Sequence, residues 1–200
     1  MDNRKIGVFD SGVGGLTVFS EIIKQLPNED ITYIGDTKRF PFGNKSKESI
    51  ISISKQIVNY LILQDVKLIV IACGTATSQA LEELRKIYKI PIIGIIEPTI
   101  ENCIKEDTKS VGIIATKGTI RSGEWEKQIK QKNNNIETIS IETPLLASMA
   151  EEGWTQNEVA KAAIKEYMKE YKNTQIEKLI LGCTHYPLFE SRRRRTFCMP

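Results

Sequence analysis

Short apolar runs rich in β-branched residues alternate along this chain with longer stretches whose apolar residues recur every three or four positions. The first pattern is typical of buried strands and the second of amphipathic helices. Alternation of this kind predicts an α/β fold, in which right-handed crossovers connect the strands of a parallel sheet. The expected strands are residues 5–9, 31–35, 68–72, 91–96, 111–115, 136–141 and 179–181.

Helices are expected between these strands. One runs from about residue 16 to residue 26 and ends at Pro27. Ser46 is the expected N-cap of the next, because a serine side chain can accept a hydrogen bond from the first turn. Thr155 and Glu158 have the spacing of a capping box, which predicts a helix running to about residue 171. A further helix is expected at residues 101–106, and a core-facing stripe at Ile50, Ile53, Ile57 and Leu61.

The two halves of the chain resemble each other. In residues 67–75 and again in residues 178–184, a strand is followed by a small residue, a cysteine and then a threonine. The repeat predicts two similar doubly wound parallel-sheet domains facing each other across a cleft. The predicted division is residues 1–97, residues 98–190 and a basic tail at residues 191–200.

The charge balance bears on the partners of the chain. It carries 28 Lys and Arg against 25 Asp and Glu, but four arginines form one block at residues 192–195, so the rest is close to neutral. This distribution does not favour a nucleic-acid partner. No apolar run approaches the roughly 18 residues of a membrane span, and the start lacks the pattern of a secretory signal. We therefore expect no membrane partner and a cytoplasmic location.

Residues able to do chemistry lie where the predicted strands end. Ligands of open α/β sheets bind outside the carboxyl ends of the strands, so these turns are expected to form one site. The turns carry Asp10, Ser11, Asp36, Cys73, Thr75, Thr116, Cys183, Thr184 and His185.

Cys73 and Cys183 occupy equivalent places in the two halves, each at an expected helix start, where backbone amides lower a thiol pKa. Two facing domains would aim the thiols at one cleft from opposite sides. One thiolate could then remove a proton from a carbon centre while the opposite thiol returns one to the other face. A disulfide is the alternative, and it would require the two turns to touch. No metal is expected, because two cysteines and one histidine at these spacings make no familiar zinc ligand set.

His185 is the only histidine and lies two residues after Cys183, as a partner of that thiol or a donor to a carboxylate. Asp10 and Asp36 could assist Cys73, or serve as a helix cap and a turn residue. Residues 10–15 resemble a phosphate loop but lack its Lys-Ser/Thr ending. Backbone amides at a helix start bind a carboxylate equally well, so a small carboxylate substrate is favoured over a nucleotide.

Several motifs in order resemble the glutamate racemases of the aspartate/glutamate racemase family. They cover residues 5 to about 190 and read IGVFDSGVGGL at 6–16, GDT at 35–37, PFGNKS at 41–46, ACGTATS at 72–78 and GCTHYPL at 182–188. The resemblance implies interconversion of L- and D-glutamate without a cofactor, supplying D-glutamate for peptidoglycan. A relative acting on aspartate or another small acidic substrate is the alternative. A homodimer is compatible with the sequence.

The resemblance also assigns roles to residues. It implies that Cys73 and Cys183 transfer protons and that Asp10, Glu151 and His185 tune them. It implies a substrate-binding set of Asp10, Ser11, Asp36, Phe42, Gly43, Gly74, Thr75, Thr116, Thr184 and His185.

The chain departs from the family pattern in places. Phe42 stands where tyrosine is common, Gly74 where asparagine is common, and Ser148 where proline is frequent. Residues 191–200 do not resemble the family, whose members continue through further strand–helix units that complete the first domain. We therefore expect a truncated or frame-shifted end and an incomplete first domain. An inactive fragment is the alternative to an active enzyme, and a nucleic-acid arm is the alternative for the tail.

Overall fold

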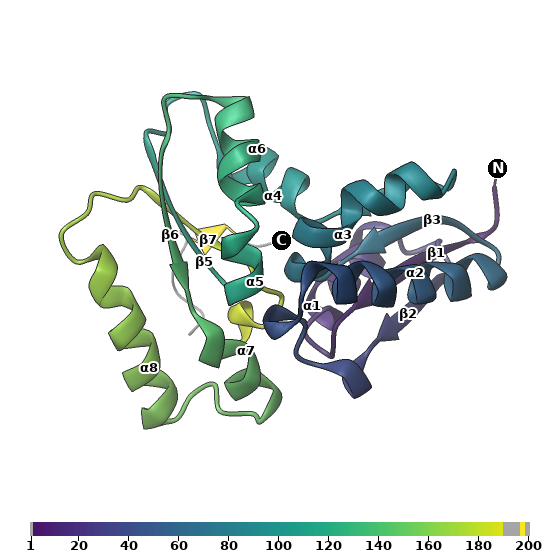
Figure 1. Ribbon diagram of the computed structural model, residues 1–200, viewed down its shortest axis with the longest axis horizontal. Coiled ribbons are helices and arrows are strands. Elements are labelled where there is room, and N and C mark those ends of the chain that lie inside the picture. The colour runs from purple at the N-terminus through teal and green to yellow at the C-terminus, as the bar shows by residue number, and fades with distance from the viewer. Residues whose placement is uncertain (1, 190–196, 199–200) are drawn as a thin grey trace.

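The computed structural model describes residues 2–189 and 197–198. Its strands form two four-stranded sheets, ordered β2-β1-β3-β4 and β6-β5-β7-β8. Every neighbouring pair is parallel. Figure 1 shows the two halves side by side, the first coloured purple to teal and the second mostly green to yellow. The prediction of two parallel-sheet α/β halves is confirmed.

The first half begins with the central strand of its sheet, which is buried on both faces as parallel sheets require. Its strands are β1 (Lys5–Asp10), β2 (Ile31–Gly35), β3 (Val66–Ile71) and β4 (Ile92–Gly94). Its helices are α1 (Leu16–Gln25), α2 (Lys47–Leu63) and α3 (Gly74–Ile87), with short 3-10 turns η1 (Thr37–Arg39) and η2 (Phe42–Asn44).

The second half repeats this plan around the fully buried strand β5. Its strands are β5 (Ser110–Ala115), β6 (Glu137–Glu142), β7 (Lys178–Leu181) and the short β8 (Phe197–Cys198). Its helices are α4 (Ile96–Cys103), α5 (Lys117–Arg121), α6 (Glu124–Lys132), α7 (Pro144–Glu151) and α8 (Glu158–Met168), with 3-10 turns η3 (Lys169–Tyr171) and η4 (Tyr186–Phe189).

Helix α2 begins and packs as its sequence predicts. The Ser46 side chain accepts a hydrogen bond from Ser49 N at 3.3 Å, which satisfies an amide of the first turn. The predicted stripe of Ile50, Ile53, Ile57 and Leu61 is buried in the core of the first half. Apolar residues three and four positions apart therefore hold α2 against the first sheet.

Two helices begin elsewhere than expected. The helix predicted at residues 101–106 is instead α4, because Ile96 and Ile100 pack into the core of the second half. Its early start also shortens the strand predicted at residues 91–96. Helix α8 is capped not by Thr155 but by Asn157, whose side chain accepts a hydrogen bond from Ala160 N at 2.9 Å.

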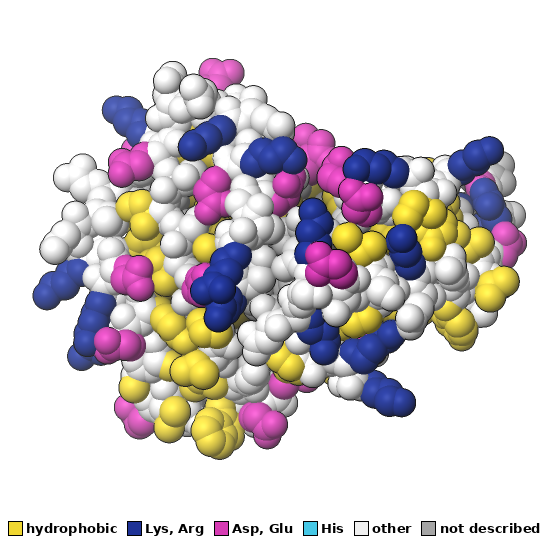
Figure 2. Space-filling view, viewed as in Figure 1, with side chains coloured by type: hydrophobic (Ala, Val, Ile, Leu, Met, Phe, Trp, Pro, Cys, Tyr) yellow, Lys and Arg dark blue, Asp and Glu magenta, His cyan; other side chains and the backbone are white. Residues whose placement is uncertain are grey.

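The predicted division between residues 97 and 98 falls inside α4, and it stays a prediction. The predicted tail contributes β8, which pairs with β7. The arginine block at residues 192–195 lies outside the described residues. Within the described ranges, no helix is both long and apolar enough to cross a membrane. On the face in Figure 2, Lys and Arg are interspersed with Asp and Glu, and several such pairs lie one helical turn apart.

Candidate active site

The turns after β1, β3 and β7 meet where the two halves face each other. Together with residues from the turns after β2 and β5, they line a small cavity of about 20 Å³. Among the residues expected in the site, those that line the cavity are Ser11, Phe42, Gly43, Cys73, Gly74, Thr75, Thr116, Cys183, Thr184 and His185. The wall is completed by Phe40, Pro41, Ala147 and Gly182, which sequence reasoning did not single out.

Three expected site residues do not line the cavity. Asp10 and Glu151 lie behind the wall of the cavity. Asp10 accepts a hydrogen bond from Thr184 and Glu151 contacts His185, and both Thr184 and His185 line the wall. Asp36 is the N-cap residue that precedes η1, and its carboxylate accepts a hydrogen bond from Arg39 Nε at 2.6 Å. The structure thus brings Asp10 and Glu151 to the site as supporting groups, whereas Asp36 is engaged by an arginine outside it.

Cys73 follows β3 and is the N-cap of α3. Its Sγ accepts a hydrogen bond from Ala76 N at 3.4 Å and donates one to Ser11 Oγ at 3.6 Å. Burial raises the pKa of the Cys73 thiol to about 12, and the nearby Asp10 carboxylate adds to this rise. The backbone amides at the helix start lower this pKa as predicted, but the loss of hydration on burial outweighs them, so the pKa of the thiol is raised overall.

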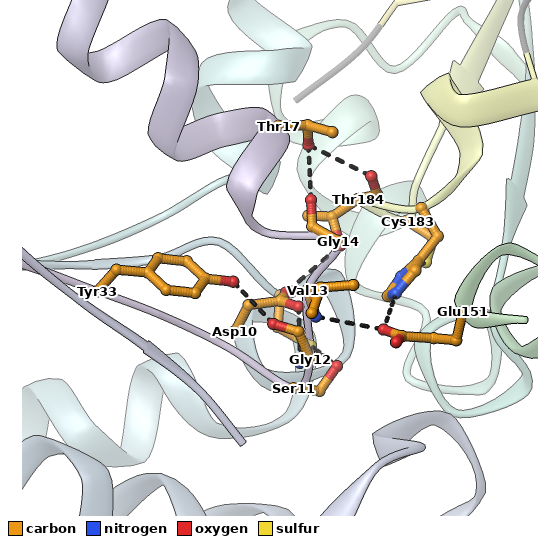
Figure 3. Close-up of polar contacts among 12 residues, drawn as sticks. Asp10, Ser11, Gly12, Val13, Gly14, Thr17, Tyr33, Glu151, Cys183 and Thr184 are labelled. Carbon is orange, nitrogen blue, oxygen red and sulfur yellow. Dashed lines mark hydrogen bonds and ion pairs between the residues drawn. The ribbon is translucent and has the colours of Figure 1, made fainter. Parts of the chain in front are cut away.

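Cys183 lies at the end of a chain of three side chains from the second half. Its Sγ is 3.6 Å from Nδ1 of His185, and Nε2 of His185 is 2.6 Å from Oε1 of Glu151. The same Glu151 oxygen accepts a hydrogen bond from Val13 N at 3.2 Å, as Figure 3 shows. Burial raises the pKa of the Cys183 thiol. When His185 donates Nε2–H to Glu151, its Nδ1 is left as an acceptor for the thiol proton.

Asp10 is a fully buried carboxyl group between the two halves. It accepts hydrogen bonds from Gly12 N at 3.0 Å and from Thr184 Oγ1 at 3.4 Å. Burial raises the pKa of this carboxyl group, although the hydrogen bonds it accepts oppose the rise. Asp10 thereby joins the glycine-rich turn after β1 to the turn after β7 (Figure 3).

Glycines allow the two halves to approach backbone to backbone. A Cβ atom at Gly14 would lie 2.5 Å from the His185 ring, and one at Gly74 would lie 2.4 Å from the carbonyl oxygen of Gly182. Gly74 therefore permits a contact that a side chain at this position would obstruct. Phe42, another departure from the family pattern, is buried in the core of the first half.

The arrangement defines the chemistry available. Cys73 and Cys183 are both free thiols, which excludes the alternative of a disulfide between them. In the part of the chain that the structure describes, no group of three or more His, Cys, Asp or Glu could hold a metal ion. Each half contributes one thiol, and threonine and serine hydroxyls line the space between them. Such a cavity can take a proton from one side of a small polar molecule and return one from the other.

Comparisons with known proteins point in one direction. The family model described as Asp/Glu/Hydantoin racemase matches residues 6–200. A glutamate racemase from Geobacter metallireducens is 46% identical over 188 residues, which are 94% of this chain and 70% of that protein. One from Lactococcus lactis subsp. cremoris is 48% identical over 189 residues, 94% of this chain and 69% of that protein.

Two solved structures share the fold closely. The glutamate racemase from Francisella tularensis in complex with D-glutamate is 43% identical with a TM-score of 0.90, covering 94% of this chain and 72% of its own. A glutamate racemase isoform from Bacillus anthracis is 37% identical with a TM-score of 0.91, covering 100% of this chain and 77% of its own.

Proposed function

Because the chain belongs to the Asp/Glu/hydantoin racemase family, we propose that it interconverts L- and D-glutamate. The observation that carries this proposal is the pair of buried free thiols, one from each half, at a single cavity. The binding of D-glutamate by the Francisella tularensis relative supports glutamate as the small-molecule substrate.

The reaction inverts one carbon centre. A thiolate on one side removes the Cα proton, and the electron pair is delocalised into the adjacent carboxylate. The thiol on the opposite side then delivers its own proton to the other face of Cα, which leaves the enantiomer and a new thiolate. The two cysteines have exchanged roles, so the site is left in the protonation state that acts on the opposite enantiomer until the thiols exchange protons with solvent. Hydrogen bonds to the substrate carboxylate stabilise the charge that builds up in the transition state.

His185 and Glu151 tune the thiol of Cys183. Glu151 accepts the Nε2 proton, which leaves Nδ1 facing the sulfur at 3.6 Å. Nδ1 can then accept the thiol proton, forming a thiolate beside an imidazolium that Glu151 stabilises.

Asp10 is assigned to the Cys73 side. Burial raises the pKa of the Cys73 thiol and the Asp10 charge adds to the rise, so an incoming ammonium group would offset that charge and ease formation of the Cys73 thiolate. Substrate binding and activation of this cysteine are then coupled through one buried carboxyl group.

The substrate carboxylates are assigned to the hydroxyl groups and backbone amides of the cavity wall. The hydroxyls come from Ser11, Thr75, Thr116 and Thr184, and the amides from residues 42–43 and 74–75. The D-glutamate formed would serve peptidoglycan synthesis in the cytoplasm, and a homodimer is compatible with this function.

Proton NMR of L-glutamate with the full chain in deuterated buffer tests the proposal. With the wild-type protein we expect the Cα proton signal to disappear and D-glutamate to form, whereas Cys73→Ser, which lacks one of the two transfer groups, should form no D-glutamate. Aspartate, examined under the same conditions, should exchange much more slowly. A folded wild-type protein that leaves the Cα signal of L-glutamate unchanged would rule out the proposed activity.

A further inference from the structure

Three threonine hydroxyls meet at the boundary between the halves. Thr75 belongs to α3, Thr116 precedes α5, and Thr119 lies within α5. The Oγ1 atom of Thr75 is 2.9 Å from that of Thr116 and 3.1 Å from that of Thr119, and the latter two are 2.9 Å apart. All three side chains are buried, Thr119 completely. The hydroxyls therefore form a closed triangle of hydrogen bonds.

Thr119 is the member of the triangle that does not reach the cavity. Thr75 and Thr116 line the wall, and Thr119 lies behind them. Thr116 is the N-cap of α5, yet its side chain makes no capping hydrogen bond. A threonine inside a helix often bonds a carbonyl of the preceding turn, whereas the Thr119 hydroxyl is directed at the other two threonines. The hydroxyls of Thr116 and Thr119 are therefore committed to the triangle and not to the backbone of α5.

The surroundings hold the triangle in place. Gln79 of α3 donates a hydrogen bond from Nε2 to Gly118 O at 3.0 Å, which joins α3 to α5 beside the triangle. On another side, a Cβ atom at Gly43 would lie 2.6 Å from Cβ of Thr116, so η2 packs closely against the start of α5. Because both halves contribute to this packing, the three oxygens have little freedom to move apart.

Counting protons shows what the third hydroxyl can do. A hydroxyl donates one hydrogen bond and accepts up to two. With three hydrogen bonds among three hydroxyls, each threonine donates to one neighbour and accepts from the other, so all three protons are used within the triangle. A carboxylate only accepts, and hydrogen bonds to it are stronger than those between neutral hydroxyls. Thr75 and Thr116 can both turn their protons to a carboxylate while Thr119 donates to one of them, leaving no buried donor unpaired.

We propose that Thr119 is a positioning residue for substrate binding. It holds the Oγ1 atoms of Thr75 and Thr116 at the cavity wall. When both of these donate to one substrate carboxylate, Thr119 donates its own proton to one of the two oxygens, so that no buried hydroxyl proton is left unpaired. The inference rests on the proposed function, since glutamate supplies that carboxylate. Because Thr119 does not touch the reacting atoms, it should affect binding far more than proton transfer.

Two substitutions separate the hydroxyl from the shape of the side chain. Thr119→Val keeps the branched shape and removes the hydroxyl, whereas Thr119→Ser keeps the hydroxyl. We expect Thr119→Val to weaken binding of D-glutamate and raise KM by about tenfold, the effect of losing one to two buried hydrogen bonds. kcat should fall by less than KM rises, because Thr119 acts on the carboxylate only through Thr75 and Thr116 and touches no reacting atom. Thr119→Ser should restore wild-type binding.

The measurements are calorimetric titration with D-glutamate and kinetics of Cα exchange. Thr99→Val is the matched control, because Thr99 is similarly buried but its hydroxyl donates to the carbonyl of Ile95, the N-cap residue of its own helix α4, at 2.7 Å. It should leave the Kd unchanged. If Thr119→Val fails to fold, Thr119→Ala, which also removes the hydroxyl group, is measured in its place.

Three results would overturn the inference. They are unchanged D-glutamate affinity in Thr119→Val, equal weakening in Thr119→Ser, or a fall in kcat with no change in Kd. If wild-type protein neither binds nor exchanges glutamate, the proposed function fails and the inference falls with it. If the wild type is active and Thr119→Val matches it, the inference alone fails.

Discussion

Cys73 and Cys183 couple the protonation of the site to the stability of the fold. Burial raises the pKa of the Cys73 thiol from 9.0 to about 12 and raises that of Cys183 as well. The unfolded chain therefore loses these protons at a lower pH than the folded protein does. Stability from this source is fully present below about pH 9 and is lost as the pH rises toward the folded pKa.

We accordingly expect the free energy of unfolding to fall above about pH 9, by up to about 1.4 kcal/mol per pH unit for each thiol. Cys73→Ser lacks one contribution, so its decline should be shallower. Urea unfolding at about pH 8 and about pH 10 measures both slopes. Buried tyrosines titrate in both proteins, so they contribute equally to the two pH slopes and do not affect the difference between them. Identical slopes for the two proteins would contradict the burial argument.

Gly74 is the residue at which the halves approach most tightly beside the thiols. A Cβ atom there would lie 2.4 Å from the carbonyl oxygen of Gly182, which is backbone and cannot rotate away. Gly74→Ala should therefore displace the turn after β7 and lower kcat/KM for glutamate, but by less than about tenfold, because the resemblance to a family in which asparagine is common here indicates that a side chain is accepted at this position.

Gly7→Ala is the control for that substitution. Its Cβ would meet the flexible end of Leu61 at 3.1 Å, away from the cavity, so exchange kinetics should stay close to wild type. Circular dichroism establishes that both variants fold. Wild-type activity in Gly74→Ala would show that the close approach at this point is not needed.

The position of most site residues could be predicted from the sequence, because each follows a strand. Ser11, Cys73, Cys183 and His185 all lie at the cavity. The direction of the thiol pKa shift could not be predicted, since it depends on burial in the folded protein, which no local sequence pattern encodes. Thr119 was missed for a similar reason: it meets Thr75, which is 44 positions away along the chain.

At the scale of helices and strands, the start of α8 provides a test of capping. The structure assigns the cap to Asn157, although the sequence pattern favoured Thr155. Asn157→Ala should destabilise the protein by about 1 kcal/mol, the usual effect of losing an N-cap side chain. Thr155→Ala should have a much smaller effect. Thermal or urea unfolding measures both losses of stability. A larger loss in Thr155→Ala than in Asn157→Ala would favour the capping box predicted from the sequence.

Elements with regular apolar spacing or dense β-branched runs were predictable from local sequence. Strand β2 and the stripe of α2 coincide with their predictions because local pattern and packing agree. Helix α4 differs because tertiary packing of Ile96 overrode the expected strand end. The strand β8 pairs with β7 at only two positions, which is too short for a periodic pattern.

At the scale of the whole molecule, function depends on how the two halves meet. The repeat in the sequence predicts two halves, but their closeness comes from glycines whose neighbours lie far away in the chain. A ligand bound between the halves should stabilise both together. D-glutamate at about one hundred times its Kd should add about 2.7 kcal/mol to the free energy of unfolding. Thermal unfolding with and without D-glutamate measures this, and glutamine, which lacks the second carboxylate, is the control ligand.

The central claim is that two different thiols act on opposite faces of Cα. The measurement that tests it most directly is the isotope content of both enantiomers early in the reaction of L-glutamate in deuterated buffer. If one cysteine removes the proton and the other delivers its own, the D-glutamate formed carries deuterium at Cα from the first turnover, while unreacted L-glutamate keeps protium. D-glutamate that retains the original protium would show that one group serves both faces, and would contradict the account.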